Sequence, residues 1–189
     1  MSKLIAVFDA CVLYPAPLRD LLMHLATTDL FRAKWTNEIH QEWIRNLLKN
    51  RKDLTLSQLE RTRDLMNSHV LDCLVEDYSH LIPTIDLKDK DDRHVVAAAI
   101  ASHASMIVTY NIGDFPKIIL DKYHISVYHP DDFVCHLFNL SNSKVIKAVQ
   151  KQRKYLKNPP ITALEFVDMF EKMQLKYFSD KLRTNIELI

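Results

Sequence analysis

Apolar and polar residues alternate along the chain in blocks that predict strands and helices in turn. Leu4–Phe8 is a continuous apolar run, which is typical of a strand buried on both faces of a parallel sheet. Shorter apolar runs at residues 30–35, 106–109 and 125–128 predict three more strands. Between the strands, apolar residues recur at helical spacing. This alternation favours an α/β fold in which helices cover a parallel sheet.

Capping patterns locate the starts of two helices. Ser57 is followed by Glu60, and Thr162 by Glu165, and a hydroxyl residue with an acid three positions later is the pattern of a capping box. We expect the second of these helices to run without a break to about residue 182, because its apolar residues keep helical spacing.

The character of the chain changes after about residue 140. Residues 143–157 are basic and helical in pattern, and a pair of prolines then interrupts them. We therefore divide the chain into a domain of residues 1–140 and a helical C-terminal extension of residues 141–189.

Composition narrows the class of protein. The chain has 189 residues, of which 48% are hydrophobic and 26% charged, as in an ordinary globular protein. No apolar run approaches the ~20 residues that span a bilayer, and the amino terminus lacks the pattern of a signal peptide. The three cysteines are scattered, which predicts neither a disulfide framework nor a zinc site. We expect a cytoplasmic protein without a membrane segment.

Acidic or amide residues stand where the apolar runs end. Asp9 follows the first strand, Asn111 and Asp114 follow the run 106–109, Asp92 opens the helix before that run, and Glu42 borders the apolar side of its helix. Ligands gather outside the carboxyl ends of strands in open parallel sheets. Clustered carboxylates repel one another unless a cation is present, and Mg²⁺ prefers oxygen ligands. The pattern indicates a metal-dependent enzyme that acts on phosphate.

Each of these residues also has an ordinary structural interpretation. Asp9 can cap a turn, Glu42 can be a solvated helix residue, and Asp92 can be a helix N-cap. Asn111 and Asp114 are common turn formers. Spacing alone leaves both interpretations open.

Three stretches of the sequence resemble a known family, and this resemblance decides between the metal-site and the ordinary structural interpretations. The stretches are FDACVLYPAPLRDLL (8–22), DLKDKDDRHVVAAAIASHASMIVTYNIGDFP (86–116) and HPDDF (129–133). In this order they resemble the PIN domain, and more narrowly the VapC-like ribonuclease toxins of bacterial type II toxin–antitoxin modules. The resemblance implies an α/β/α sandwich around a parallel sheet of four to five strands. It also implies a Mg²⁺ or Mn²⁺ site, cleavage of RNA by water, an antitoxin partner and the possibility of a homodimer.

The same resemblance assigns roles to individual residues. Asp89 and Asp91 are alternatives to Asp92 as the third acid of the motif, and Asn111 stands where many relatives have Asp, which removes one possible charge. Thr109 is expected to steady the loop by hydrogen bonding. The set of catalytic and metal-binding residues that the resemblance implies is Asp9, Glu42, Asp92 and Asp114, with Asn111 and Thr109 in support.

Two further residues near the acids have open interpretations. His94 follows Asp92 closely and is either a general base or a structural or solvent-facing residue. Cys11 lacks a recognisable histidine partner, so we expect it to pack rather than to act as a nucleophile.

Basic residues form two clusters that are candidate RNA contacts. Arg45 and Lys49 lie at the end of the helix that carries Glu42. Lys147, Lys151 and Lys154 lie in a segment without an acid. Such runs are either solvated helix faces or strips that follow phosphates.

The sequence therefore predicts a Mg²⁺- or Mn²⁺-dependent endoribonuclease, the toxin half of a toxin–antitoxin pair. One rival is a PIN-like module that binds RNA or a partner without cleaving it. Another is an RNA-processing nuclease that is not a toxin.

Overall fold

A computed structural model describes residues 4–189 of the chain. Its sheet is parallel, with the strand order β2-β1-β3-β4. The chain leaves β1 for β2 on one side and later enters β3 on the other, so the strand order reverses between β1 and β3. The strands are β1 (Leu4–Phe8), β2 (Phe31–Lys34), β3 (Met106–Val108) and β4 (Ser126–Tyr128).

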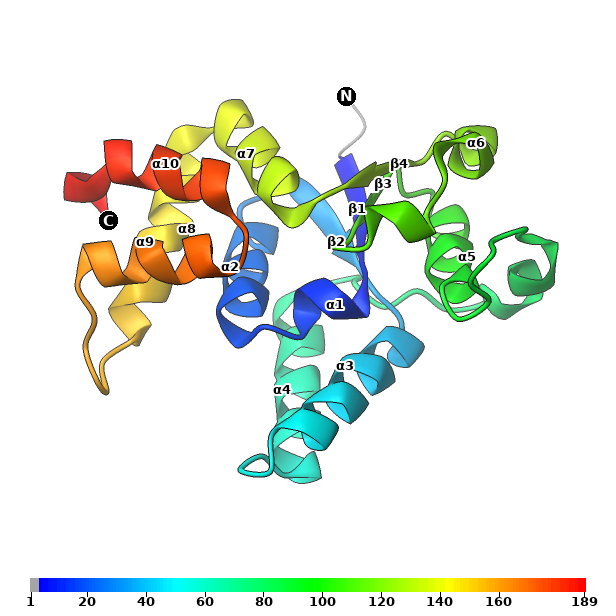
Figure 1. The fold of residues 1–189 in the computed structure, drawn as a ribbon, viewed down its shortest axis with the longest axis horizontal. Coiled ribbons are helices and arrows are strands. Elements are labelled where there is room, and N and C mark those ends of the chain that lie inside the picture. The colour runs from blue at the N-terminus through cyan, green and yellow to red at the C-terminus, as the bar shows by residue number, and fades with distance from the viewer. Residues whose placement is uncertain (1–3) are drawn as a thin grey trace.

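Helices cover both faces of this sheet. Figure 1 shows α5 on one side of the sheet and α2 and α7 on the other, and this arrangement confirms the expected α/β/α sandwich. The α-helices are α1 (Ala10–Leu13), α2 (Ala16–Ala26), α3 (Asn37–Asn50), α4 (Leu56–His69), α5 (Arg93–Ala101), α6 (Lys117–Leu120), α7 (Pro130–Leu140), α8 (Asn142–Tyr155), α9 (Ala163–Lys172) and α10 (Lys176–Thr184).

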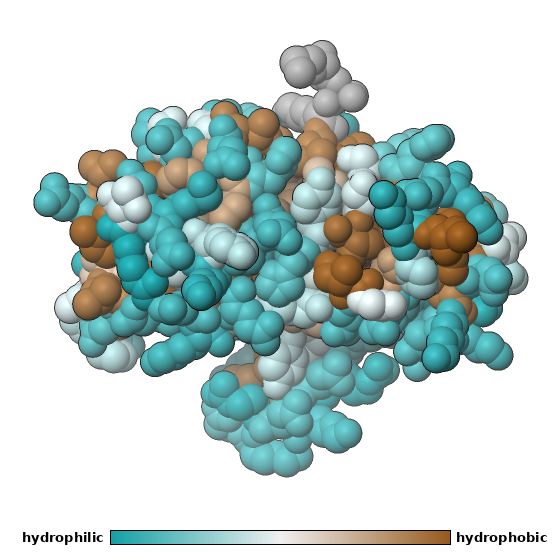
Figure 2. Space-filling view, turned by 45° about the horizontal axis from the view of Figure 1, so that its top comes forward, coloured by the Kyte–Doolittle hydropathy of each residue, from teal (hydrophilic) through white to brown (hydrophobic). Residues whose placement is uncertain are grey.

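One face of the molecule is mainly polar. Figure 2 shows a face on which hydrophobic residues gather in a few separate patches among hydrophilic ones. Within residues 4–189, no helix has the length and apolar character needed to cross a membrane.

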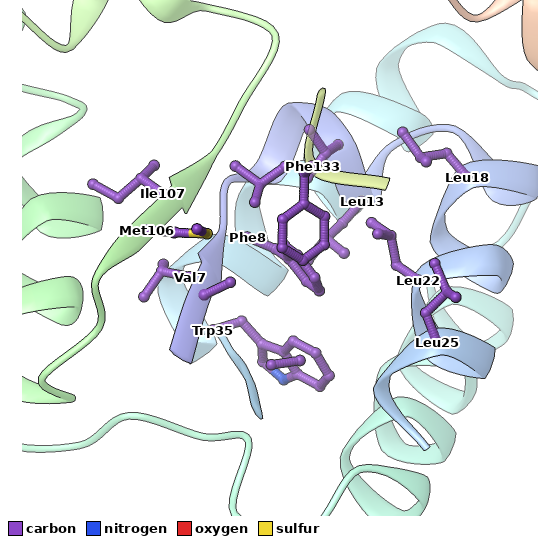
Figure 3. Packing of buried hydrophobic residues seen from close by; sticks show 14 of the residues in the cluster. Val7, Phe8, Leu13, Leu18, Leu22, Leu25, Trp35, Met106, Ile107 and Phe133 are labelled. Atoms are coloured by element: carbon purple, nitrogen blue, oxygen red, sulfur yellow. The ribbon is translucent and has the colours of Figure 1, made fainter. Parts of the chain in front are cut away.

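Aromatic residues fill the core between the sheet and α7. Phe133 of α7 lies with its ring centroid 5.7 Å from that of Phe8 and 5.1 Å from that of Phe31, and Trp35 stacks on Phe8 (Figure 3). All four side chains are almost fully buried. Because burial of one such side chain contributes about 1.5–3 kcal/mol, α7 is an integral part of the fold.

The C-terminal helices pack onto this core. α8 runs along α2, and α10 packs against α7 and α9 (Figure 1). The buried carboxylate of Asp131 on α7 accepts hydrogen bonds from the N–H groups of Tyr177 (2.9 Å) and Phe178 (2.8 Å) in the first turn of α10. A negative charge at a helix N-terminus is favourable, so Asp131 fixes where α10 begins. The division of the chain at residue 140 stays a prediction.

The expected single helix from residue 163 to 182 is wrong. α9 ends at Lys172 and α10 begins at Lys176, and between them Gln174 has φ 65°, a left-handed conformation that ends helices. The turn lets Phe178 pack against Phe170 with ring centroids 5.7 Å apart. Tertiary packing, rather than a glycine or proline, breaks the helix.

Of the two predicted capping boxes, one is confirmed and one is wrong. Thr162 and Glu165 cap α9 reciprocally. The other helix, α4, begins at Leu56, and its N-cap Thr55 pairs with Gln58 in the capping box. Thr55 and Gln58 satisfy the same rule as Ser57 and Glu60, because Gln can replace Glu at the third position.

Candidate active site

Asp9 and Thr109 lie side by side because their strands are neighbours. Phe8 of β1 pairs with Val108 of β3, and the next residue of each strand therefore leaves the sheet at the same edge. The Thr109 hydroxyl donates to Asp9 Oδ2 (2.7 Å), and the N–H of Ala10 donates to Asp9 Oδ1 (2.6 Å). Asp9 is thus the N-cap of α1, a short helix that the hydrophobic pattern did not predict. Its carboxylate is buried, and both of its oxygens accept hydrogen bonds.

Cys11 belongs to the same group of hydrogen bonds. Its sulfur lies 3.1 Å from Asp9 Oδ2 and 3.2 Å from Thr109 Oγ1, and it accepts the N–H of Tyr110 at 3.2 Å. Burial and the neighbouring Asp9 raise the pKa of the Cys11 thiol to about 12. A protonated thiol is a poor nucleophile. The residue therefore packs, as expected, but it also joins Asp9 to the loop after β3, which the sequence did not reveal.

The loop after β3 carries Asn111 and Asp114. The N–H of Asn111 donates to Thr109 Oγ1 (3.0 Å), and the N–H of Asp114 donates to the carbonyl of Asn111 (3.0 Å). Both side chains are exposed. Thr109 thus bonds to the loop, as the resemblance implies, and also to Asp9, which the sequence did not indicate.

Tyr110 connects this loop to the C-terminal helices. Its hydroxyl donates to the carbonyl of Met173 (2.9 Å) in the turn between α9 and α10, while its N–H bonds to Cys11. A chain of contacts therefore runs from that turn to Asp9.

Asp92 lies among several other carboxylates. Burial, and after it the negative charges of nearby carboxylates, together raise the pKa of Asp92 to about 7; the carboxylates are Asp9, Asp89, Asp114 and Glu42. Asp92 stands at the N-cap position of α5 but makes no side-chain capping hydrogen bond. Its carboxyl group is therefore not used in holding the helix, and it lies close enough to the other carboxylates for their charges to raise its pKa.

Glu42 reaches the same region from α3, where it contacts His94 of α5. His94 Nε2 lies 3.3 Å from Glu42 Oε1, and Nδ1 lies 3.8 Å from Glu38 Oε2. Burial lowers the pKa of His94, but Glu42, Glu38 and Asp9 outweigh that effect and raise it. His94 is buried, so the alternative that it faces solvent is wrong. The contacts of His94 and Glu38 were missed, since nothing in the sequence pairs α3 with α5.

The candidate RNA contacts are exposed on two helices. Arg45 and Lys49 are exposed on α3, and Lys147, Lys151 and Lys154 are exposed on α8. Among residues 4–189, no ion pair or hydrogen bond joins them to the acidic cluster. Their positive charges are thus free to meet a substrate.

The donor chemistry of the cluster suits a hard divalent cation. Within the described residues, no three His, Cys, Asp or Glu side chains converge into a ready-made metal group. Mg²⁺, however, usually keeps several waters and takes only one or two carboxylates together with substrate phosphates. Burial and carboxylate repulsion both raise the pKa of Asp92, and a bound cation relieves the repulsion. The residues therefore fit such an ion, with the buried Asp9 and the nearby Asp92 at the centre.

Comparison with known proteins places the chain in a family. Residues 6–113 match the family model described as PIN domain, which is more than half of the 189-residue chain. The chain belongs to the PIN-domain family. A second model, described as VapC50 C-terminal domain, matches residues 130–184, from the start of α7 to the end of α10.

One curated relative of this PIN-domain protein is Putative ribonuclease VapC50 from Mycobacterium tuberculosis (strain ATCC 25618 / H37Rv). The two are 33% identical over 106 residues, which are 56% of this chain and 62% of the relative. The aligned part is thus less than two thirds of the relative's length. No solved structure matches the chain. The roles assigned to individual site residues stay predictions.

Proposed function

We propose that this PIN-domain protein is a metal-dependent endoribonuclease that hydrolyses RNA phosphodiester bonds. The observation that carries the proposal is the group of carboxylates near Asp92, among them Asp9 at the edge where β1 and β3 end. Burial and these negative charges together raise the pKa of Asp92 to about 7. Perturbed carboxyl groups at such an edge are typical of functional sites. The similarity to a relative named as a ribonuclease supports RNA as the substrate.

The carboxylates have distinct roles in this proposal. Asp9, Glu42 and Asp92 would hold Mg²⁺ or Mn²⁺, and Asp114 would either add a ligand or position the attacking water. Such an ion, when bound, lowers the pKa of a water and neutralises charge on a phosphoryl oxygen. The hydrogen bonds from Thr109 and Ala10 keep Asp9 in one orientation.

Direct attack by water is the chemistry that the side chains favour. The thiol of Cys11 is kept protonated, because its pKa is raised to about 12, so a covalent intermediate on sulfur is disfavoured. His94 lies within ion-pair distance of Glu42 and Glu38, where, when protonated, it would orient Glu42.

Exposed cations would bind the RNA backbone. Lys and Arg contacts to phosphate dominate the affinity of nucleic-acid-binding proteins. The candidates are Arg45 and Lys49 on α3 and Lys147, Lys151 and Lys154 on α8.

The biological role that we propose is the toxin half of a type II toxin–antitoxin pair in the cytoplasm. The match of residues 130–184 to the VapC50 C-terminal domain supports it. An antitoxin would inhibit by covering the acidic site, with a basic side chain in place of the cation. Expression without the antitoxin should arrest growth, and Asp9→Asn should abolish the arrest. If active protein is expressed without growth arrest, the toxin role is contradicted, and the nuclease assignment is unaffected.

Cleavage of total RNA by the purified protein tests the chemistry directly. Discrete fragments should form with Mg²⁺ or Mn²⁺, and EDTA or Asp9→Asn should prevent them. Asn111→Asp should restore or increase activity if the missing charge limits metal affinity. If a folded preparation free of antitoxin cleaves no RNA with either metal, the nuclease proposal is contradicted. A PIN-like binding module then becomes the better interpretation.

A further inference from the structure

A pocket of about 590 Å³ lies between the PIN domain and the C-terminal helices, away from the acidic cluster. Its volume is in the range of small-molecule sites. We call it the seam pocket, because α2 and α4 form one side and α8 and α9 the other. Its lining residues are Ala16, Pro17, Arg19, Asp20, Met23, His24, Thr27, Thr62, Leu65, Met66, His69, Lys151, Gln152, Tyr155, Leu156 and Met169.

Hydrogen bonds hold the two sides of the seam in place. Gln152 Nε2 donates to the carbonyl of Pro17 (2.8 Å), and Lys144 Nζ donates to the carbonyl of Thr28 (2.8 Å). Both bonds join α8 to α2 or to the residues just after it. The pocket is therefore part of the folded molecule, and α8 supplies one of its walls.

An exposed aromatic ring stands at the pocket. Tyr155 is 66% exposed, and its ring stacks on that of His24 with centroids 6.1 Å apart and planes 2° from parallel. A tyrosine ring has a large apolar face, which stacking removes from water. A parallel pair with one ring open to solvent offers a surface on which another flat ring can stack.

A row of positive charges borders the same ring. Lys147, Lys151 and Lys154 are spaced four and three residues apart on α8, so they share one exposed helix face. Lys151 lines the pocket and Tyr155 is one residue beyond Lys154. α8 contains no acidic residue. A polyanion that follows this face would pass the stacked rings.

The polar residues inside the pocket differ from those at its border. Among the described lining residues, Asp20 is the only acid, and a carboxylate there repels phosphate but accepts a hydrogen bond from an amino group or a ribose hydroxyl. Apolar side chains such as Leu65 and Met66 form the opposite wall. The interior of the pocket thus suits a nucleobase, and the lysine border suits a phosphate.

We propose that the seam pocket binds an unstacked base of single-stranded RNA, stacked on Tyr155, while the lysines of α8 bind the adjoining phosphates. Aromatic platforms combined with a cationic groove are the usual means of binding single strands. The inference rests on the proposed function for its substrate class, and it assigns the C-terminal helices a share in substrate selection.

Binding of a short single-stranded oligoribonucleotide that contains 2-aminopurine tests the proposal. The full chain carrying Asp9→Asn is used in EDTA, so that binding is measured without cleavage, and 2-aminopurine emission falls when the base stacks. Tyr155→Ala should weaken binding roughly tenfold or more and abolish the fall in emission. Tyr155→Phe should keep both, because the ring remains. Lys151→Gln should weaken binding and reduce its dependence on salt.

Matched controls separate the pocket from general effects. Tyr177 on α10 is also 66% exposed, and Tyr177→Ala should bind as the parent does. Lys122→Gln, at an exposed lysine on another part of the surface, controls for loss of one charge. A hairpin duplex of the same composition should bind more weakly than the single strand.

The outcomes distinguish this inference from the proposed nuclease. If the protein cleaves RNA but Tyr155→Ala leaves binding and emission unchanged, the pocket assignment is overturned and the nuclease stands. The pocket would then be assigned to a protein partner such as an antitoxin segment. An equal loss in Tyr177→Ala overturns it as well. Binding that depends on Tyr155 in a protein that cleaves nothing supports the pocket and contradicts the nuclease.

Discussion

At the scale of single residues, the geometry of Asp9 depends on one hydroxyl. Thr109 donates to Asp9 Oδ2 and accepts the N–H of Asn111. It therefore holds the Asp9 carboxylate in place relative to the loop that carries Asp114. Partners of this kind matter because small displacements of a metal-binding carboxylate reduce turnover. The residue was expected to help through a hydrogen bond, and the bond to Asp9 gives that expectation a definite partner.

Replacing Thr109 tests this role. Thr109→Val keeps the volume of a fully buried side chain but removes the hydroxyl, and RNA cleavage should fall about 10–100-fold. Most of the loss should appear in kcat, since Thr109 is buried beneath the site. Thr109→Ser should retain most activity because it restores the donor. Equal losses in the Val and Ser variants would show that packing, not the hydroxyl, is what matters.

Asp92 gives the metal-free protein a predictable dependence on pH. Its pKa is raised from 3.8 to about 7 in the folded chain. Between these values the folded state keeps a proton that the unfolded state has lost, so the free energy of unfolding falls as the pH rises from about 4 to 7. Above about pH 7 both states are ionised and the loss is complete.

Asp92→Asn should remove this loss. In EDTA at pH 8 the variant should be more stable than the parent by on the order of 1–2 kcal/mol. This gain is smaller than the full pKa shift implies, because solvent screens part of the repulsion. The difference should disappear towards pH 4. Denaturant unfolding at the two pH values measures it, and a variant less stable than the parent at pH 8 would contradict the electrostatic account.

At the scale of elements, the sequence predicts strands better than it predicts helix ends. Leu4–Phe8 reads as a strand because every side chain in it is apolar, and burial on both faces needs that pattern. The break at Gln174 has no glycine or proline signal. Only the packing of Phe178 onto Phe170 and the cap from Asp131 make two helices more stable than one.

The cap from Asp131 is itself testable. Asp131→Asn removes the charge that accepts the N–H groups of Tyr177 and Phe178, and the variant should lose about 1.5–3 kcal/mol, the usual contribution of hydrogen bonds to a charged group. Asp132→Asn is the matched control. Asp132 is the next residue on α7 and is exposed, so its replacement should change stability little. Thermal unfolding of both variants measures the effect. Equal stability of the two variants would mean that α10 is held by its apolar face alone.

At the scale of the whole molecule, strand order decides which predicted residues meet. The sequence placed Asp9 and Asp114 after two strands, and they share an edge only because β1 and β3 are neighbours. That adjacency follows from the family resemblance rather than from local patterns. The contact between His94 and Glu42 joins helices that are far apart in the sequence, so no single segment could have revealed it.

A divalent cation should therefore stabilise the whole fold, since the acids it would join come from separate elements. Ligand binding to the folded state alone stabilises it by about 2.7 kcal/mol at 100 times Kd, which corresponds to roughly 5–10 °C in the Tm of a chain of this size. Mg²⁺ or Mn²⁺ should raise the Tm of the parent at pH 8 relative to EDTA. Asp9→Asn should abolish most of the rise.

The size of this effect should depend on pH because the ligands must lose their protons before they bind. Asp92, with its pKa of about 7, should make the rise in Tm smaller at pH 6 than at pH 8. Asp121→Asn, at an exposed acid outside the cluster, should retain the full rise. If the parent melts at the same temperature with and without the ion, or if Asp9→Asn gains as much as the parent, the carboxylates around Asp92 do not form a metal site. Their repulsion would then be a cost that the fold tolerates without any cation.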